Sequence, residues 1–267
     1  MGIGVIAKTA TAGLGLALAA ALGANVAAAE TLAGLKDGNT IVWIDSDQKK
    51  VVGSVKLANG GKLVGIDVRP SDGKLYGMTA DGAIVVVDHK TGEWEKKSQI
   101  SEKLPADAMF SVDFNPAADR LRVITSTGMS LRINVDDGKT IVDGSLKYAD
   151  ADAAKGKTPK VTAVGYSNSF AGTKETTLYD IDATAGTLLK QAPPNDGVVS
   201  TLGKLGVKTD GPIAFDVLSD GKGANVGWLL ANGELHTVDL TTGAAKSVGK
   251  IAGLSGTISD IAILPAK

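Results

Sequence analysis

The chain has 267 residues, of which 43% are hydrophobic, 4% aromatic and 21% charged, with a formal net charge of −1. This composition is typical of a globular protein, and it excludes disordered and collagen-like classes. The near-neutral charge and the lack of a basic run exclude nucleic acid as an expected partner. Because there is no cysteine, disulfides and thiol chemistry are also excluded, and the core alone must hold the fold.

Residues 1–29 differ from the rest of the chain. Lys8 gives a short positive start, residues 10–24 are rich in alanine, leucine and glycine, and Ala27-Ala28-Ala29 offers a cleavage pattern before Glu30. These features predict a secretory signal peptide, and hence a periplasmic or secreted protein. A membrane anchor is the alternative, which the small side chains disfavour. Residues 30–267, with a net charge of −2, are then expected to form a single domain.

The stretch of residues 63–92, LVGIDVRPSDGKLYGMTADGAIVVVDHKTG, sets the pattern on which the chain is built. Three short apolar runs are separated by turns. The Asp81-Gly82 pair between two of them predicts a hairpin, since a type I′ turn needs a positive φ at both central residues. A fourth run, EWEKKSQI, follows Gly92. The unit therefore predicts a four-stranded antiparallel meander.

Copies of this unit recur along the chain. Residues 110–141, 161–205 and 212–248 repeat the whole pattern, whereas residues 31–57 match only its second to fourth strands. Residues 259–265, SDIAILP, match a first strand with nothing after it. The two incomplete ends together make one more unit, so the chain holds five.

Equivalent positions in the five units are Asp67, Asp113, Gly165, Asp216 and Asp260, which are 46, 52, 51 and 44 residues apart. A four-stranded repeat of this length is typical of a β-propeller blade. We therefore predict an all-β fold, a β-propeller of five four-stranded blades, with six blades as the alternative. The C-terminal strand is expected to join the N-terminal blade and close the ring, which protects the strand edges.

Several motifs together resemble the bacterial exported family known as domain of unknown function 4394. They are GIDVRPSDGKLYGMTADG, VDFNPAADRLRVITSTGMSLRINVDDG, TTLYDID and PPNDG, of which DFNPAADRLRV followed by LRxNxDxG is the most specific. The resemblance covers nearly all of the chain after residue 29. It implies a secreted or periplasmic propeller-like domain, similar to YVTN and WD40-type repeats, and it implies no activity and no catalytic residues.

The repeated aspartates, Asp67, Asp113, Asp216 and Asp260, are the first candidates for a site, because the first strand of a propeller blade lies nearest the axis. The favoured interpretation is structural, with each carboxylate capping backbone N–H groups of its own or the next blade. The alternative is a ring of carboxylates that binds a cation, with Gly165 opening one side. Oxygen ligands would favour calcium or magnesium over zinc. No cofactor is expected otherwise.

Three arginines form a second set of ligand-binding candidates, Arg69, Arg122 and Arg132. Arg122 and Arg132 flank one hairpin turn, and like charges on neighbouring strands are unfavourable without a partner. The expected partner is an aspartate of the ring or of a neighbouring loop, and the alternative is a carboxylate or phosphate ligand. Tyr166 and Asn168 complete the candidate set.

These patterns favour a binding or scaffold module, for a partner protein or a small ligand, over an enzyme. The alternative is a propeller-type hydrolase that acts on a sugar or lactone through axial carboxylates, with or without a divalent cation. The aspartates are equivalent by repeat, which favours structure before catalysis. No G-x-S-x-G motif occurs, and the two histidines lack a zinc-site spacing. We expect a monomer with no membrane partner once residues 1–29 are removed.

Overall fold

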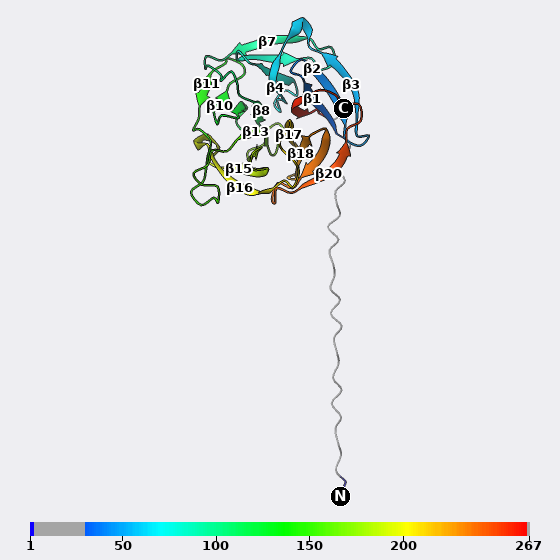
Figure 1. The fold of residues 1–267 in the computed structure, drawn as a ribbon, viewed down its shortest axis with the longest axis vertical. Coiled ribbons are helices and arrows are strands. Elements are labelled where there is room, and N and C mark those ends of the chain that lie inside the picture. Colours follow the sequence, from blue (N-terminus) through cyan, green and yellow to red (C-terminus); the bar gives the residue numbers. More distant parts are fainter. Residues whose placement is uncertain (3–29, 266–267) are drawn as a thin grey trace.

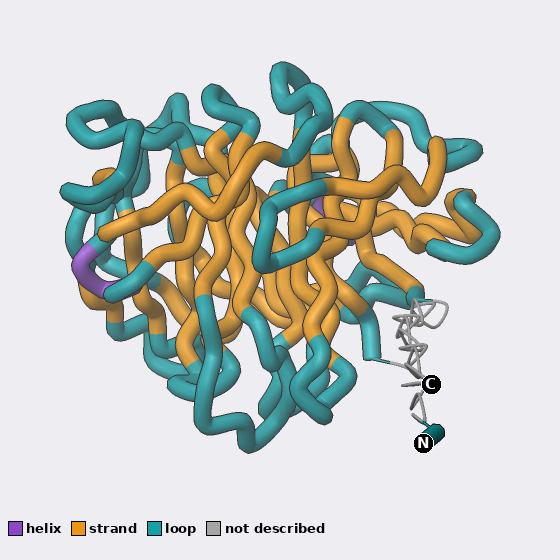
Figure 2. The backbone as a smooth tube through the Cα atoms, turned by 90° about the horizontal axis from the view of Figure 1, so that it is seen from below, coloured by secondary structure: helices purple, strands orange, loops and turns teal. Residues whose placement is uncertain are grey.

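The computed structural model describes residues 1–2 and 30–265, and the described part is almost entirely β-strand (Figure 1). The predicted signal peptide therefore lies outside the described residues apart from its first two. Within the described residues, 21 strands form five sheets around a central axis. The paired strands are antiparallel, except for β12 and β16. Figure 2, a view from the side, shows these strands crossing the ring, with loops gathered on two faces. The predicted five-bladed β-propeller is confirmed.

We number the blades along the chain and give their strands from the axis outward. Blade 1 contains β21 (Ile258–Ile263), β1 (Thr31–Lys36), β2 (Thr40–Asp45) and β3 (Lys50–Lys56). Blade 2 contains β4 (Leu63–Val68), β5 (Leu75–Thr79), β6 (Ala83–Val87) and β7 (Trp94–Gln99). Blade 3 contains β8 (Phe110–Asn115), β9 (Arg120–Thr125), β10 (Ser130–Ile133) and β11 (Thr140–Val142).

Blades 4 and 5 complete the ring. Blade 4 contains β13 (Val161–Tyr166), β14 (Leu178–Asp182), β15 (Thr187–Gln191), β16 (Val198–Lys204) and β12 (Lys147–Tyr148). Blade 5 contains β17 (Ile213–Ser219), β18 (Asn225–Ala231), β19 (Glu234–Val238) and β20 (Ala245–Lys250). In Figure 1, β4, β8, β13 and β17 surround the centre, whereas β7, β11, β16 and β20 lie at the rim.

The ring is closed by its two ends. Strand β21 pairs antiparallel with β1, so that Ile263 lies opposite Leu32 and Asp260 lies opposite Leu35. The last strand of the chain is thus the innermost strand of blade 1, as its isolated first-strand pattern predicted.

Blade 4 departs from the prediction in one respect. Residues 143–160 lie between two of the predicted repeat units, and β12 within them pairs in parallel with β16, which makes this sheet five-stranded. The side chain of Tyr148 is buried, and its hydroxyl donates a hydrogen bond to Asp182 Oδ2 at 2.6 Å. Two residues are too few to show an alternating pattern, so this strand carries no signal in the sequence.

The hairpin turns follow the sequence with one exception. Asp37-Gly38 and Asn232-Gly233 have positive φ at both residues, as a type I′ turn requires. The expected hairpin at Asp81-Gly82 is present, but only Gly82 has a positive φ, so the predicted turn type is wrong there. Thr79 decides this geometry, because its hydroxyl oxygen accepts the N–H of Ala83 at 2.9 Å across the turn.

The hydrophobic core lies between the blades rather than at the axis. Each of five apolar clusters joins one blade to the next, and the cluster between blades 1 and 2, for example, packs Leu35 and Ile41 against Ile66 and Leu75. A blade buries its apolar faces only against its neighbours, so the ring must be complete for each blade to be stable.

Candidate functional site

The repeated aspartates meet near the axis. Asp67, Asp113, Asp216 and Asp260 lie on the innermost strands β4, β8, β17 and β21, and each is at most 5% exposed. One carboxylate oxygen each of Asp67, Asp113 and Asp216 lie within 4.8 Å of one another. We call these three residues the axial cluster. Oxygens at this spacing can surround a hard cation, and the carboxyl groups influence one another's titration.

The same carboxylates join successive blades. Asp67 Oδ1 accepts the N–H of Val68 at 2.7 Å, and its Oδ2 accepts the N–H of Phe114 in the next blade at 2.7 Å. The equivalent inter-blade bonds run from Tyr166 N–H to Asp113 at 3.2 Å, from Ile263 N–H to Asp216 at 2.7 Å and from Ile66 N–H to Asp260 at 3.1 Å. The geometry is that of the capping interpretation, and it leaves the cation alternative as a prediction.

Burial raises the pKa of every carboxyl in this set. It is the largest cause at Asp67, where the charge of Asp216 adds to it and two backbone N–H groups oppose it. Burial followed by the charge of Asp67 raises the pKa of Asp113, and burial raises the pKa of Asp216 to about 6. None of these carboxylates forms an ion pair within residues 30–265. A shared proton or a cation would each relieve this repulsion.

Gly165 occupies the fifth equivalent position, in β13, and it does not open the ring. A Cβ atom added there would lie 2.9 Å from Val217 Cγ2 and 3.0 Å from Phe215 Cε1, both in blade 5. Close packing of β17 therefore fills this position. The expectation that Gly165 opens one side of a cation site is wrong.

Arg69 belongs to a separate ion-pair cluster between blades 2 and 3. Its Nε and Nη2 donate to both carboxylate oxygens of Asp119 at 2.8 and 2.6 Å, and its Nη2 also donates to Asp136 at 3.0 Å. Hydrogen bonding to Asp119 is the main cause that raises the pKa of Arg69. Because its donors are already engaged by this fork-shaped pairing, Arg69 acts as a clamp between the blades.

Arg122 and Arg132 lie opposite each other on β9 and β10 and share one carboxylate, that of Asp143. Arg122 Nη1 lies 2.5 Å from Asp143 Oδ2, and Arg132 Nε lies 2.7 Å from the same atom. Arg122 is fully buried, and Asn195 accepts a further bond from it at 3.0 Å. The acidic partner expected for this pair thus comes from a neighbouring loop rather than from the axial ring.

Asp180 is a buried acid that sequence reasoning missed. It lies on β14 between blades 3 and 4, is fully buried, and neither of its carboxylate oxygens has a hydrogen-bond partner. Burial raises its pKa to about 8, against the opposing charge of Arg122. The alternation in LYDID, which places Asp180 on the same face as Leu178, was the available signal.

Tyr166 and Asn168 hold blade 4 to its neighbours. The Tyr166 hydroxyl accepts a hydrogen bond from Arg122 Nε at 3.2 Å, and the ring is buried. Asn168 exchanges hydrogen bonds with Asn225 of blade 5, its N–H donating at 2.7 Å and its Oδ1 accepting at 2.8 Å. Of the sequence-predicted residues, only the aspartates converge on the axis.

Two hollows lie near the axis, and the innermost strands contribute residues to both. At the end where the innermost strands begin, a hollow of about 920 Å³ is lined by residues of all five blades. We call it the wide mouth. One lining residue from each blade, in blade order, is Ser259, Val64, Phe110, Thr162 and Ile213. A smaller hollow of about 430 Å³ lies at the other end of the innermost strands, and Asp67 and Asp216 are among the residues that line it.

Strand irregularities shape the wide mouth. Val64, Thr162 and Ser259 each stand at a break in strand register, between the paired residues on either side. Such bulges turn a side chain away from the regular alternation and often border functional sites. Sequence reasoning missed this hollow, because a bulge depends on the pairing partner and leaves no pattern in the strand itself.

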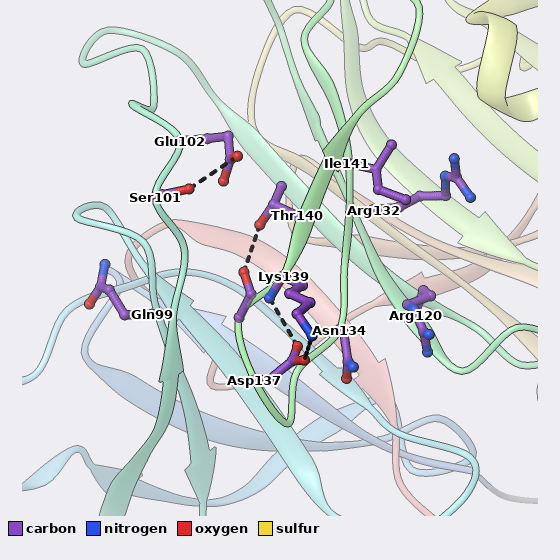
Figure 3. Close-up of a pocket in the computed structure, with 11 residues that line it drawn as sticks. Gln99, Ser101, Glu102, Arg120, Arg132, Asn134, Asp137, Lys139, Thr140 and Ile141 are labelled. Carbon is purple, nitrogen blue, oxygen red and sulfur yellow. Dashed lines mark hydrogen bonds and ion pairs between the residues drawn. The ribbon is translucent and has the colours of Figure 1, made fainter.

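A third hollow, of about 600 Å³, lies at the rim between blades 2 and 3 (Figure 3). Ser101 and Glu102 form one wall, and Arg120 and Asp137 stand on the other side. Lys139 pairs with Asp137 at 3.1 Å, and Arg120 donates to backbone carbonyl oxygens. Glu102 Oε1 accepts a hydrogen bond from Ser101 at 3.2 Å, whereas its Oε2 has no partner in the described residues. Only two blades contribute to this groove.

The sequence pattern of the family described as Domain of unknown function (DUF4394) matches residues 40–262. The chain belongs to this family. The match extends from β2 of blade 1 to within β21, so it includes the repeated aspartates and the arginines described above. A comparison with curated protein sequences finds no match.

Two of the solved structures that resemble this member of the family come from Bacteroides. A protein of unknown function from B. thetaiotaomicron has a TM-score of 0.51 and 15% identity, covering 82% of this chain and 54% of its own. An auxiliary nutrient binding protein from B. ovatus has a TM-score of 0.45 and 16% identity, covering 80% and 57%. The chain thus spans about half the length of each, and the likeness to the first shows the fold alone. No helix in the described residues is long and apolar enough to cross a membrane.

Proposed function

We propose that this protein is an exported binding module that takes a small ligand in the wide mouth of the propeller. The observation that carries the proposal is the convergence of all five blades on one hollow of about 920 Å³. Ligand sites are commonly concave, mostly apolar hollows of this size, with a few convergent polar groups. Hydrogen bonds join the innermost strands of neighbouring blades, and these bonds position the side chains around the axis.

The hydrolase alternative draws no support from the axial cluster. Asp67 and Asp216 each use both carboxylate oxygens to accept backbone N–H groups, and Asp113, which accepts only one, is 3% exposed. A general acid or nucleophile needs a carboxyl oxygen that can reach the reacting bond. The arrangement therefore supports a structural role for these aspartates, and binding at the wide mouth is the function that we propose.

The test is a binding screen on the purified protein from residue 30 onward. Sugars, amino acids, fatty acids and aromatic heterocycles are tested by the shift in melting temperature, and hits are measured by calorimetry. Two variants locate the site: Ala108→Trp fills the wide mouth, and Ala117→Trp adds the same bulk in the turn between β8 and β9.

The expected result is a ligand that Ala108→Trp excludes and Ala117→Trp accepts. A ligand that binds both variants equally well would place binding elsewhere and overturn the proposal. If no small molecule binds, and a protein partner binds the wild type and Ala108→Trp equally well, the protein has a scaffold role. That result would also overturn the proposal.

A further inference from the structure

The walls of the wide mouth are mainly apolar. Leu63, Phe110, Pro212 and Ile213 line it together with several alanines. At its rim stand two lysines and two aspartates, Lys62, Lys160, Asp37 and Asp210, so the rim carries no net charge. A strongly charged ligand would lose its hydration on entering without meeting an opposite charge inside.

Two of the five hydroxyl groups that line the wide mouth are engaged in hydrogen bonds to backbone carbonyls. Thr209 Oγ1 donates to the carbonyl of Ala183 at 2.7 Å, and Ser259 Oγ donates to the carbonyl of Leu35 at 3.3 Å. A sugar, whose hydroxyls each need a partner when buried, would meet mainly apolar side chains there. The hollow therefore suits a ligand with few polar groups.

Among the described residues, Thr162 is the one buried threonine of the wide mouth whose hydroxyl has no partner. It is 6% exposed, it lines the wide mouth, and its Oγ1 has no hydrogen-bond partner in the described residues. A buried hydroxyl without a partner is costly, and in native proteins it commonly marks a group that something else completes. The bulge at Thr162 gives its side chain this position.

Met109 adds an independent observation. It is 47% exposed although it is a large apolar side chain, and it lines the wide mouth next to Phe110. Its backbone is fixed, because its N–H donates to Ser126 Oγ at 3.0 Å and its carbonyl accepts the N–H of Ser126 at 2.9 Å. A flexible thioether on a fixed backbone is typical of adaptable apolar binding surfaces.

From these contacts we infer that the ligand of the wide mouth is an uncharged, mainly apolar small molecule with a single hydrogen-bonding group. Thr162 Oγ1 pairs with that group at the inner end, and Met109 covers the apolar body at the entrance. This inference rests on the proposed function, because it names the ligand class of the same site.

The experiment uses N-phenyl-1-naphthylamine, an uncharged fluorophore with one N–H group that Thr162 Oγ1 can accept. Its fluorescence is titrated against the wild-type protein and against Thr162→Val and Thr162→Ser. Valine keeps the shape of threonine without its hydroxyl, and serine keeps the hydroxyl. We expect Thr162→Val to weaken binding about five- to tenfold, and Thr162→Ser to bind within about twofold of wild type.

A second readout separates a binding role from a folding defect. Without ligand, Thr162→Val should melt at or above the wild-type temperature, because it removes an unpaired buried hydroxyl. Met109→Lys should weaken the probe, whereas Val52→Lys, at an equally exposed site on β3, should not. Equal binding by wild type and Thr162→Val would overturn the role of the hydroxyl.

Competition distinguishes failure of this inference from failure of the proposed function. 1-Decanol, uncharged and with one hydroxyl, should displace the probe, and maltose should not. If maltose binds and Ala108→Trp abolishes that binding, the wide mouth is the site but the ligand class is wrong. If Ala108→Trp leaves probe binding intact, the site itself is wrong.

Discussion

Asp67 Oδ2 lies 2.7 Å from the backbone nitrogen of Phe114, so a side chain of blade 2 fixes the innermost strand of blade 3. The other oxygen of Asp67 accepts the N–H of Val68, whereas Asp113 accepts a single backbone N–H, that of Tyr166, among the described hydrogen bonds. Two residues that are equivalent by repeat thus differ in how much each depends on its charge.

This difference predicts opposite effects of two matched substitutions. Asn keeps one acceptor oxygen, so Asp113→Asn retains its bond to Tyr166 and removes a crowded charge, and we expect it to stabilise the protein at pH 7. Asp67→Asn loses one of two backbone bonds, which costs about 1–2 kcal/mol. Urea denaturation measures both. If Asp113→Asn and Asp67→Asn lower the unfolding free energy equally, at every pH and with or without calcium, the carboxylates neither repel one another measurably nor share a cation.

The pH dependence of stability follows from the same burial. A carboxyl whose pKa is raised in the folded state keeps a proton that the unfolded chain releases near pH 4. Its stabilising effect is therefore complete below pH 4 and is lost as the pH rises through the folded value. For Asp216, with a folded pKa of about 6, the loss is roughly 3 kcal/mol by pH 7. Asp216→Asn should flatten this decline in urea denaturation between pH 4.5 and 7.5.

Calcium provides the control for that measurement. If a cation shares the axial cluster, 1 mM CaCl₂ should raise the stability of the wild type at pH 7, and Asp113→Asn should abolish this gain. No response of the wild type to calcium or to a chelator would exclude the cation and leave protonation of the buried carboxyls as the way in which their repulsion is relieved.

Removal of the carboxylate shared by two arginines should be severe. Asp143→Ala leaves the buried Arg122 without its ion-pair partner, and such a loss costs about 3–5 kcal/mol. The matched control is Asp137→Ala, whose exposed ion pair with Lys139 contributes at most about 1 kcal/mol. Equal unfolding free energies of the two variants would show that Arg122 finds another partner.

Asp180 predicts a gain rather than a loss. Because neither of its oxygens has a partner, Asp180→Leu should stabilise the protein, and most above pH 8, where the native carboxyl loses its proton. Thermal melting between pH 6 and 9 tests this. A variant less stable than wild type at both ends of the range would mean that Asp180 is hydrogen-bonded in solution.

Deletion of residues 259–267 should unfold the whole ring. It removes the innermost strand of blade 1 and exposes apolar surface of two neighbouring blades. We expect this to lower the free energy of unfolding by several kcal/mol, against a usual total of about 5–15 kcal/mol. The control is a permuted chain that begins near residue 257 and joins residue 265 to Glu30 by a short linker, which keeps β21 beside β1. An unchanged melting temperature after the deletion would exclude closure by β21.

The export proposal is tested at the N-terminus. Mass spectrometry of the protein from its host envelope should find Glu30 as the first residue, since Ala27-Ala28-Ala29 forms the expected cleavage pattern. A membrane-bound species that begins at Met1 would contradict cleavage.

The repeat made the architecture predictable, because each blade needs the same alternation and the same turns. The incomplete units at the two ends of the chain predicted ring closure. The equivalent positions of the aspartates in the repeats predicted that Asp67 and its counterparts lie near the axis. The wide mouth was not predictable. Thr162 and Val64 line it only because their strands slip in register, and that slip depends on β14 and β5. Asp143, the partner of two arginines, lies where the repeat no longer dictates the sequence.

The pairing of β21 with β1 has a consequence for the order in which the molecule is made. Thr31 is synthesised more than two hundred residues before Ile263. The inner edge of β1 therefore stays unpaired until β21 has been synthesised. Such an edge is prone to pair with strands of other chains. We expect that a chaperone or prompt passage through a membrane shields it, and that stalled, C-terminally incomplete chains are the form of this protein most prone to aggregate.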